Sequence, residues 1–282
     1  MHGPELLARF LSTPGPPDSH GNVWQYNSRS DRHSKVGCWG VAFDLLLTSS
    51  LLRRHVEDGK VVLGVNHEMR DFATGRKKDL DLVIARPAGS VPTPHRSLSS
   101  LALDYGAPLT SAELATLDGL PEFPVAPVGA VLVALEAKAA MTAHIKALPR
   151  LYDELNSSHV CVHGASAQAL AIAYVQVNAA EEFMSSVTNN YALTEFPARY
   201  TKHKQPGDTA RVVSKIRELP RRTRQSENGF DGIGITVLDF ANDGGPVSIV
   251  SGPPAPGTSD SDNYARMIER MATEYDTRFV GI

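Results

Sequence analysis

The sequence has few cysteines, no excess of positive charge and no long apolar run, and each absence excludes a class of protein. Two cysteines, Cys38 and Cys161, are too few for the disulfide framework of a small secreted protein. Residues 1–12 carry too short an apolar stretch for a signal peptide. No segment approaches the roughly 18 consecutive apolar residues of a membrane helix. We therefore expect a cytoplasmic protein with no membrane partner.

The composition is that of an ordinary, slightly acidic globular protein. The formal net charge is -3 and the pI is about 6.4, so the strongly basic balance that indicates a nucleic-acid partner is missing. Hydrophobic residues make up 42% and charged residues 21%, which suffices for a core and is unlike a disordered chain. The 282 residues contain no internal repeat or long linker, so we predict a single domain spanning residues 1–282.

The spacing of apolar residues predicts helices and strands that alternate along the chain. The expected helices are 4–12, 36–56, a weak one at 110–117, 142–157 around Pro149, 208–219 and 263–276. The expected strands are 129–137, 168–178, 232–240, 246–250, and a hairpin that joins 61–67 to 80–86. A segment rich in Pro, Ser and Gly at 87–129 forms an excursion, and the chain after about residue 180 forms a C-terminal extension. This order predicts an α/β fold with a central mixed β-sheet flanked by helices.

Three charged residues fall at the ends of two apolar strands. Asp81 begins one strand, while Glu136 and Lys138 end another and point to the same face because they are two residues apart. Burying an isolated charge beside a strand costs free energy, so these charged residues need an explanation. Two carboxylates suit Mg²⁺, which activates a water molecule, and a lysine beside that water stabilises developing negative charge. The pattern predicts phosphodiester hydrolysis, with Asp81 and Glu136 holding the metal and Lys138 facing the nucleophile.

Asp81 leading one strand and Glu136-Ala137-Lys138 closing the next resemble the PD-(D/E)XK nuclease superfamily over roughly residues 36–178. The hairpin before them and the helix after them are similar to the core of that family, which is helix, three strands, helix, strand. The resemblance implies a restriction-endonuclease-like core. It also implies a metal-dependent endonuclease that cuts DNA, or less often RNA, such as a restriction or phage-defence enzyme. The sequence departs from the family pattern at Leu80, where a proline is usual, and in the length of the segment between the half-motifs.

The resemblance also bears on the cofactor and the assembly. It implies Mg²⁺ as the cofactor, with Mn²⁺ as an alternative. A homodimer would suit an enzyme that cuts both strands, because its two-fold symmetry matches that of duplex DNA.

Other acidic residues are candidates for the same metal site. Asp79 shares a strand face with Asp81 and is an alternative ligand, or else a solvated strand cap. Asp44 lies on the first long helix, where the resemblance places an acid that completes the metal site; an internal partner or solvent is the other reading. Glu68 on the hairpin is a further candidate.

Basic residues form three clusters that could contact phosphates in a salt-sensitive, sequence-independent way. The clusters are Arg76-Lys77-Lys78, Lys202-His203-Lys204 beside Tyr200, and Arg221-Arg222-Thr223-Arg224. His144, Lys146 and Arg150 lie on the helix that follows Lys138 and could also reach a phosphate. The alternative for each is a solvated helix face or a hydrogen-bonded structural histidine.

Two other functions remain open. One is a nucleic-acid-binding module that keeps the nuclease-like sheet without catalysis. The other is a cysteine hydrolase in which Cys38 pairs with His33, His144, His159 or His163. Cys38 opens an apolar helix, where a buried cysteine is the commoner role. No Walker loop or zinc-finger spacing is present, and Gly232-Ile233-Gly234 lacks the third glycine of a dinucleotide-binding fingerprint.

Overall fold

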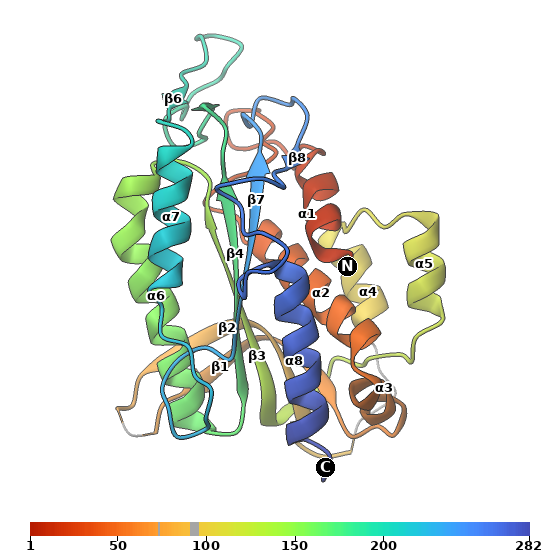
Figure 1. Cartoon of the computed structure of the whole chain (residues 1–282). Helices are drawn as coiled ribbons and strands as arrows, with labels where there is room; N and C mark the ends of the chain where they lie inside the picture. Colours follow the sequence, from red (N-terminus) through yellow and green to blue (C-terminus); the bar gives the residue numbers. More distant parts are fainter. Residues whose placement is uncertain (73, 91–95) are drawn as a thin grey trace.

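A six-stranded mixed β-sheet organises the chain in a computed structural model that describes residues 1–72, 74–90 and 96–282 (Figure 1). The strand order is β1-β2-β3-β4-β7-β8. Neighbours pair antiparallel from β1 to β3, parallel from β3 through β4 to β7, and antiparallel between β7 and β8. The strands are β1 (Val62–Arg70), β2 (Lys77–Pro87), β3 (Val128–Ala140), β4 (Leu170–Asn178), β7 (Gly232–Asp239) and β8 (Ser248–Ile249). The expected α/β fold with a mixed sheet is confirmed.

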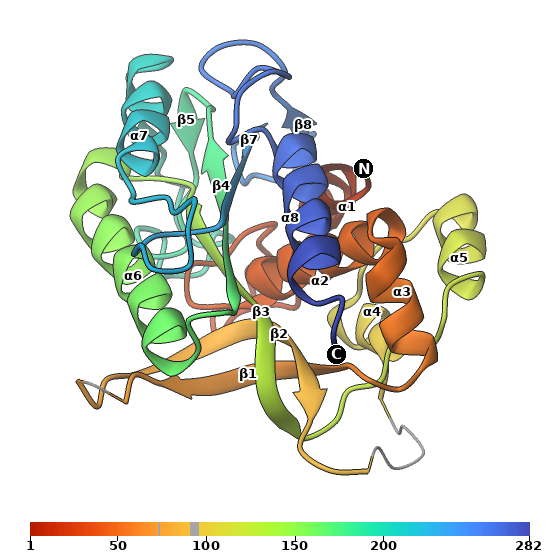
Figure 2. The ribbon, with the colours of Figure 1, turned by 60° about the horizontal axis from the view of Figure 1, so that its bottom comes forward.

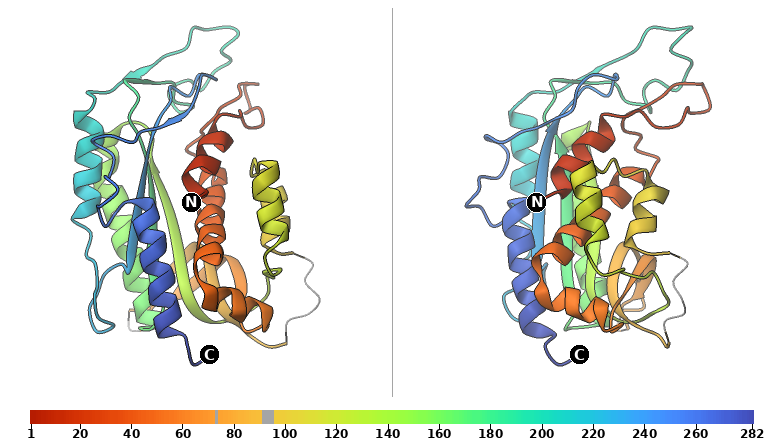
Figure 3. Two further views of the ribbon diagram at one scale, coloured as in Figure 1. Left: turned by 45° about the vertical axis from the view of Figure 1, so that its right-hand side comes forward. Right: turned by 90° about the vertical axis from the view of Figure 1, so that its right-hand side faces the viewer.

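Helices cover both faces of this sheet (Figure 3). One face is covered by α1 (Gly3–Leu11), α2 (Arg32–Thr48), α3 (Ser50–Glu57) and α8 (Tyr264–Arg278). The other face is covered by α6 (His144–Ala165) and α7 (Gly207–Arg217). Two short helices, α4 (Leu98–Tyr105) and α5 (Ser111–Asp118), lie outside α2. All nine residues of β4 are buried, as its continuous apolar sequence requires of a strand covered on both faces.

The structure differs from the sequence prediction where a local cap decides the outcome. The single helix expected at 36–56 is two helices that meet at Ser49 with a bend of 97°. Ser49 is extended, and its side chain accepts the Leu52 N–H, so it starts a new helix.

Within the described residues, no single helix is long and apolar enough to cross a membrane, although α2 and α3 pass that test as a bent pair. Helix α4, which begins with a reciprocal Ser97–Ser100 cap, was not expected.

The segments expected as an excursion and an extension both carry structure of their own. The excursion at 87–129 contains α4 and α5. The chain after residue 180 supplies β7, which lies directly beside β4, and two of the helices that cover the sheet. It also contains a small ladder of β5 (Glu182–Phe183) and β6 (Thr201–Lys202). The C-terminal third is therefore built into the same sheet as the predicted nuclease-like part.

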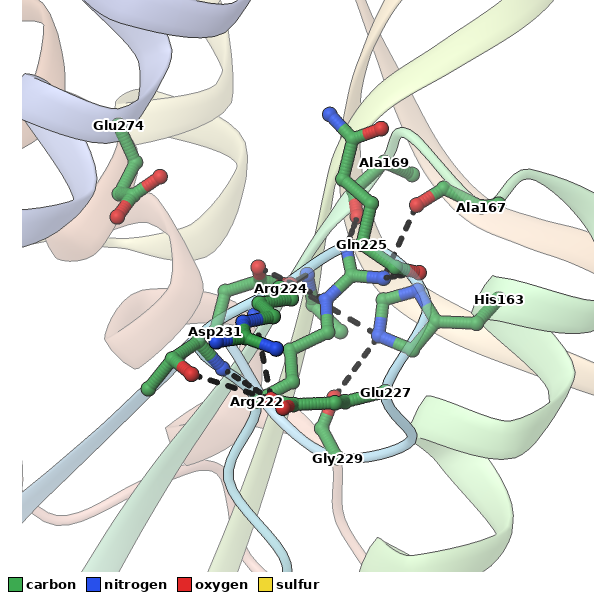
Figure 4. Close-up of polar contacts among 12 residues, drawn as sticks. His163, Ala167, Ala169, Arg222, Arg224, Gln225, Glu227, Gly229, Asp231 and Glu274 are labelled. Carbon is green, nitrogen blue, oxygen red and sulfur yellow. Dashed lines mark hydrogen bonds and ion pairs between the residues drawn. The ribbon is translucent and has the colours of Figure 1, made fainter.

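A buried ion network fastens the chain at the starts of β4 and β7 (Figure 4). Arg222 and Asp231 are at most 1% exposed, and their side chains lie 2.9 Å apart. The other carboxylate oxygen of Asp231 accepts the Ala171 N–H of β4 at 2.8 Å, and Arg278 approaches within 2.9 Å. Arg222 also donates to the carbonyls of Ala167 and Ala169. The sequence placed Arg222 in a basic cluster for phosphates; this is wrong, because its guanidinium is enclosed and neutralised.

Candidate active site

The candidate site lies at a fork where β2 leaves β3 (Figure 2). The pairing of β2 with β3 reaches Leu82 and Leu135, whereas β3 continues along β4 as far as Ala140. One edge of β3 is thus open from Glu136 onward. At the start of this edge, Asp81 accepts the Ala137 backbone N–H through Oδ2 at 2.8 Å. The carboxylate takes over a strand hydrogen bond that the diverging backbone no longer makes.

A cleft of about 490 Å³ opens along this edge. Its floor includes Asp81, Ala137 and Lys138. One wall is the segment 26–34, which leads into α2, and the other is the face of α6 that carries Arg150 and Glu154. The strand end, the loop and the helix come from separate parts of the chain, so only the fold brings them together.

Charges of opposite sign alternate across the cleft. Glu136 is 3% exposed, and its Oε1 lies 2.9 Å from Lys138 Nζ and 3.2 Å from Lys78 Nζ. Lys138 also approaches Glu154 to 3.6 Å, and Glu154 accepts from Arg150 at 2.6 Å. A buried carboxylate is tolerated when it is paired in this way. The two lysines therefore balance Glu136 and remain beside the cleft.

The fork disfavours the charge of Asp81. Burial and, second, the negative charge of Glu136 raise the pKa of Asp81 to about 6, although the Ala137 N–H and the nearby Lys138 and Lys78 act in the opposite direction. For Lys138, burial alone would lower the pKa, but the charge and hydrogen bond of Glu136, together with the charges of Asp81 and Glu154, outweigh it and the pKa is raised. A pair of crowded carboxylates with a permanently charged lysine is a site that a small cation would relieve.

The oxygen atoms at the fork suit a hard divalent cation. Glu136 Oε2 is buried with no hydrogen-bond partner among the described residues, and the bond to Ala137 occupies only one oxygen of Asp81. In the part of the chain that the structure describes, no group of three or more His, Cys, Asp or Glu side chains is placed to hold a metal. The free oxygens of Asp81 and Glu136 are too few for a closed four-ligand zinc site, whereas Mg²⁺ or Mn²⁺ can bind through one or two carboxylates and keep several waters.

The other predicted metal ligands lie outside the cleft. Asp44 is 1% exposed, and its carboxylate accepts the backbone N–H groups of His2 and Gly3 and the Tyr264 hydroxyl. This corrects its assignment as a metal ligand: it caps the start of α1. Asp79 is exposed on β2, opposite Glu68, which forms a surface ion pair with Lys77 at 2.8 Å.

The predicted nucleic-acid contacts divide into three groups. Lys78 is drawn into the site by Glu136, and Arg150 forms part of the cleft wall. Arg76, Lys77, Lys146, Lys202 and Lys204 are exposed on the surface. His144 is 2% exposed and its Nε2 donates to the Asn178 carbonyl at 2.8 Å. The expectation that His144 reaches a phosphate is therefore corrected, because its ring is enclosed between α6 and the end of β4.

Cys38 does not have the environment of a nucleophile. It is 1% exposed on α2, and burial, with the nearby charges of Asp81 and Glu136, raises the pKa of its thiol well above the usual value. A reactive cysteine needs the opposite shift. His33 lines the cleft, but burial lowers its pKa to about 4. The cysteine-hydrolase hypothesis finds no support in this geometry.

Sequence reasoning missed Glu154 and the 26–34 wall. Glu154 is one of several acids on a polar helix face, and nothing in its local sequence marks it as a partner of Lys138. Comparison of the chain with protein-family models, curated proteins and solved structures gave no match. The geometry of the fork is therefore the basis for assigning a function to this chain.

Proposed function

We propose that this protein is a Mg²⁺-dependent nuclease that hydrolyses phosphodiester bonds, with DNA as the first substrate to test and RNA as the second. The observation that carries the proposal is the meeting of Asp81, Glu136 and Lys138 at one open strand edge above a cleft. The element order supports it: with the short helices α3, α4 and α5 set aside, α2, β1, β2, β3, α6 and β4 follow the helix, three strands, helix, strand of a restriction-endonuclease-like core.

Asp81 and Glu136 would hold the metal through the oxygens that the protein leaves unused. A bound Mg²⁺ would place positive charge beside the phosphoryl oxygen and lower the pKa of a coordinated water. The protein contributes a carboxylate whose charge is disfavoured: burial and the nearby charge of Glu136 raise the pKa of Asp81, and a bound cation would stabilise its charged form. Cation binding is in this way favoured at the fork, beside the cleft.

Lys138 acts as a donor and a fixed positive charge rather than as a base. Its raised pKa keeps the ammonium protonated at neutral pH. From its position beside Glu136, the ammonium can donate to the attacking water or to a phosphoryl oxygen as negative charge develops. Lys78, which shares the same Glu136 oxygen, adds a second positive charge on the β2 side of the fork. The water oxygen forms a bond to phosphorus and gives up a proton to solvent, the phosphorus–oxygen bond to the leaving group breaks, and the leaving oxygen takes a proton from solvent.

The test is cleavage of plasmid, linear duplex, single-stranded DNA and RNA with Mg²⁺, with Mn²⁺ and with EDTA. We expect cleavage only with a metal. Lys138→Met should lower the rate by about 10²- to 10³-fold, the usual loss for one charge-stabilising donor. Glu136→Gln should lower it at least as much, while nucleic-acid binding persists because the surface lysines are unchanged.

Two exposed acids provide matched controls. Asp104→Asn removes an acid of α4 that pairs with Arg96 at the surface, and it should cut at the wild-type rate. Asp79→Asn should do the same if Asp81 alone serves the β2 side of the fork. Binding without cleavage by the wild-type protein in every metal would instead identify a non-catalytic nucleic-acid-binding module.

A further inference from the structure

Exposed apolar side chains gather at one end of the molecule, beyond the ends of β3 and β4. They come from two loops, 12–31 and 184–200, that lie side by side at the top of Figure 1 and in both views of Figure 3. Large apolar groups on a surface loop often mark a binding site when they gather in this way. The residues, with their exposed fractions, are Val23 (50%), Val187 (52%), Phe196 (56%) and Tyr200 (41%).

The second loop is held in one shape by a buried amide. Asn189 is fully buried, and its side chain accepts the Arg199 N–H at 2.7 Å and donates to the Arg199 and Ser185 carbonyls at 2.9 Å. The Tyr191 hydroxyl lies 2.9 Å from the Pro197 carbonyl. The loop is therefore closed on itself, and it presents Phe196 outward from a fixed frame.

Phe196, Tyr191 and Arg199 surround a hollow of about 300 Å³. The two rings lie 5.6 Å apart and nearly perpendicular, at 80°. The guanidinium of Arg199, which is exposed, lies 5.7 Å from the centre of the Tyr191 ring. An exposed aromatic face beside a planar cation matches a nucleobase next to its phosphate, since the Phe196 ring can stack on the base while the Arg199 guanidinium binds the anion.

The hollow is joined to the wall of the active cleft. The Asn22 side chain donates to the Tyr191 carbonyl at 2.7 Å and accepts the Leu193 N–H at 3.0 Å. Ser186 donates to Asn27 at 3.2 Å. The chain that makes these contacts continues into segment 26–34, which lines the cleft. The loop that carries the hollow is therefore packed against the segment that leads into the cleft wall.

We infer that the hollow formed by Tyr191, Phe196 and Arg199 is a stacking subsite for an unpaired nucleobase. This inference rests on the proposed nuclease function and specifies its substrate: single-stranded nucleic acid, or a duplex with a single-stranded end. Bases inside a duplex are covered on both faces by their neighbours, so they offer no free face to Phe196.

The test is binding of a labelled oligonucleotide in EDTA, measured by fluorescence anisotropy, so that cleavage plays no part. Phe196→Ala and Arg199→Ala should each weaken binding of single-stranded DNA by about 5- to 150-fold, the loss expected for one base stack. Binding of a blunt-ended duplex of two separate strands, which has no loop, should change by less than about 2-fold. Leu103→Ala is the matched control, because Leu103 is an 82% exposed apolar residue on α4, away from both loops.

The possible results separate this inference from the proposed function. If Phe196→Ala weakens single-strand binding but no metal supports cleavage, the subsite stands and the nuclease proposal fails. If the protein cuts and Phe196→Ala binds single strands as tightly as the wild type, the subsite is overturned. The inference also fails if Phe196→Ala leaves binding unchanged and converts a dimer to a monomer in sedimentation, because the hollow would then hold a second copy of the chain.

Discussion

Replacing Asp81 by asparagine should make the metal-free protein more stable at pH 8 while it abolishes cleavage. In the folded protein the pKa of Asp81 is raised to about 6 from 3.8, so above pH 6 folding must bury a charge that its surroundings disfavour. Asparagine removes that charge, and its amide oxygen can still accept the Ala137 N–H. We expect a gain on the order of 1–3 kcal/mol, or several degrees in Tm.

The pH dependence of this gain has a definite sign. Between pH 3.8 and about 6 the folded state holds a proton on Asp81 that the unfolded state has lost, so the wild-type protein loses stability as the pH rises. The advantage of Asp81→Asn should be full above pH 6 and should vanish near pH 4. Thermal unfolding in EDTA at pH 4, 6 and 8 measures it. Asp79→Asn, an exposed neighbour on the same strand, should change stability by less than about 0.5 kcal/mol at every pH. A lower Tm for Asp81→Asn at pH 8 would show that Asp81 stabilises the fold.

Asp231→Ala should cause the largest loss of stability of any substitution considered. It leaves Arg222 fully buried without its counter-charge and frees the Ala171 N–H of β4. Breaking such a pair costs about 3–5 kcal/mol, which corresponds to a fall in Tm on the order of 10 °C. Urea unfolding of the wild type and the variant gives the difference directly.

Two comparisons show whether the unpaired charge is the cause. Asp260→Ala breaks an ion pair with Arg217 whose side chains are 46% and 43% exposed, and it should cost less than about 1 kcal/mol. Arg222→Met combined with Asp231→Leu should recover part of the loss, because it removes the buried guanidinium as well, while Arg278 keeps its ion pair with Glu274. Equal losses for Asp231→Ala and Asp260→Ala would contradict the account of this network.

The proximity of Asp81, Glu136 and Lys138 could be predicted from the sequence because strand patterns are local. Asp81, Glu136 and Lys138 interrupt or end apolar strands, and a period of two residues places side chains on one face. The hairpin of β1 and β2 and the buried strand β4 could also be predicted, since turn residues specify the first and a continuous apolar run specifies the second.

The hydrogen-bond and ion-pair partners of polar side chains could not be predicted from the sequence, because they come from distant parts of the chain. Asp44 sits on the expected helix, but contacts with His2 and Tyr264 decide its role. Arg222 belongs to a basic cluster that predicts phosphate contacts, but in the fold it is buried and forms an ion pair with Asp231. The Lys138–Glu154 contact and the fork itself depend on how β2 twists away from β3, and no local pattern encodes that divergence.

The most direct test of the central claim is Mn²⁺ binding, followed by electron paramagnetic resonance as the free ion disappears. If Asp81 and Glu136 form a cation site at the fork, the wild-type protein binds one ion per chain at pH 8, and Asp81→Asn and Glu136→Gln each weaken binding by more than about 10-fold, the loss that even an outer partner of a metal ligand causes. Asp79→Asn and Asp44→Asn should bind as the wild type does. No bound ion, or binding that survives both Asp81→Asn and Glu136→Gln, would contradict the account.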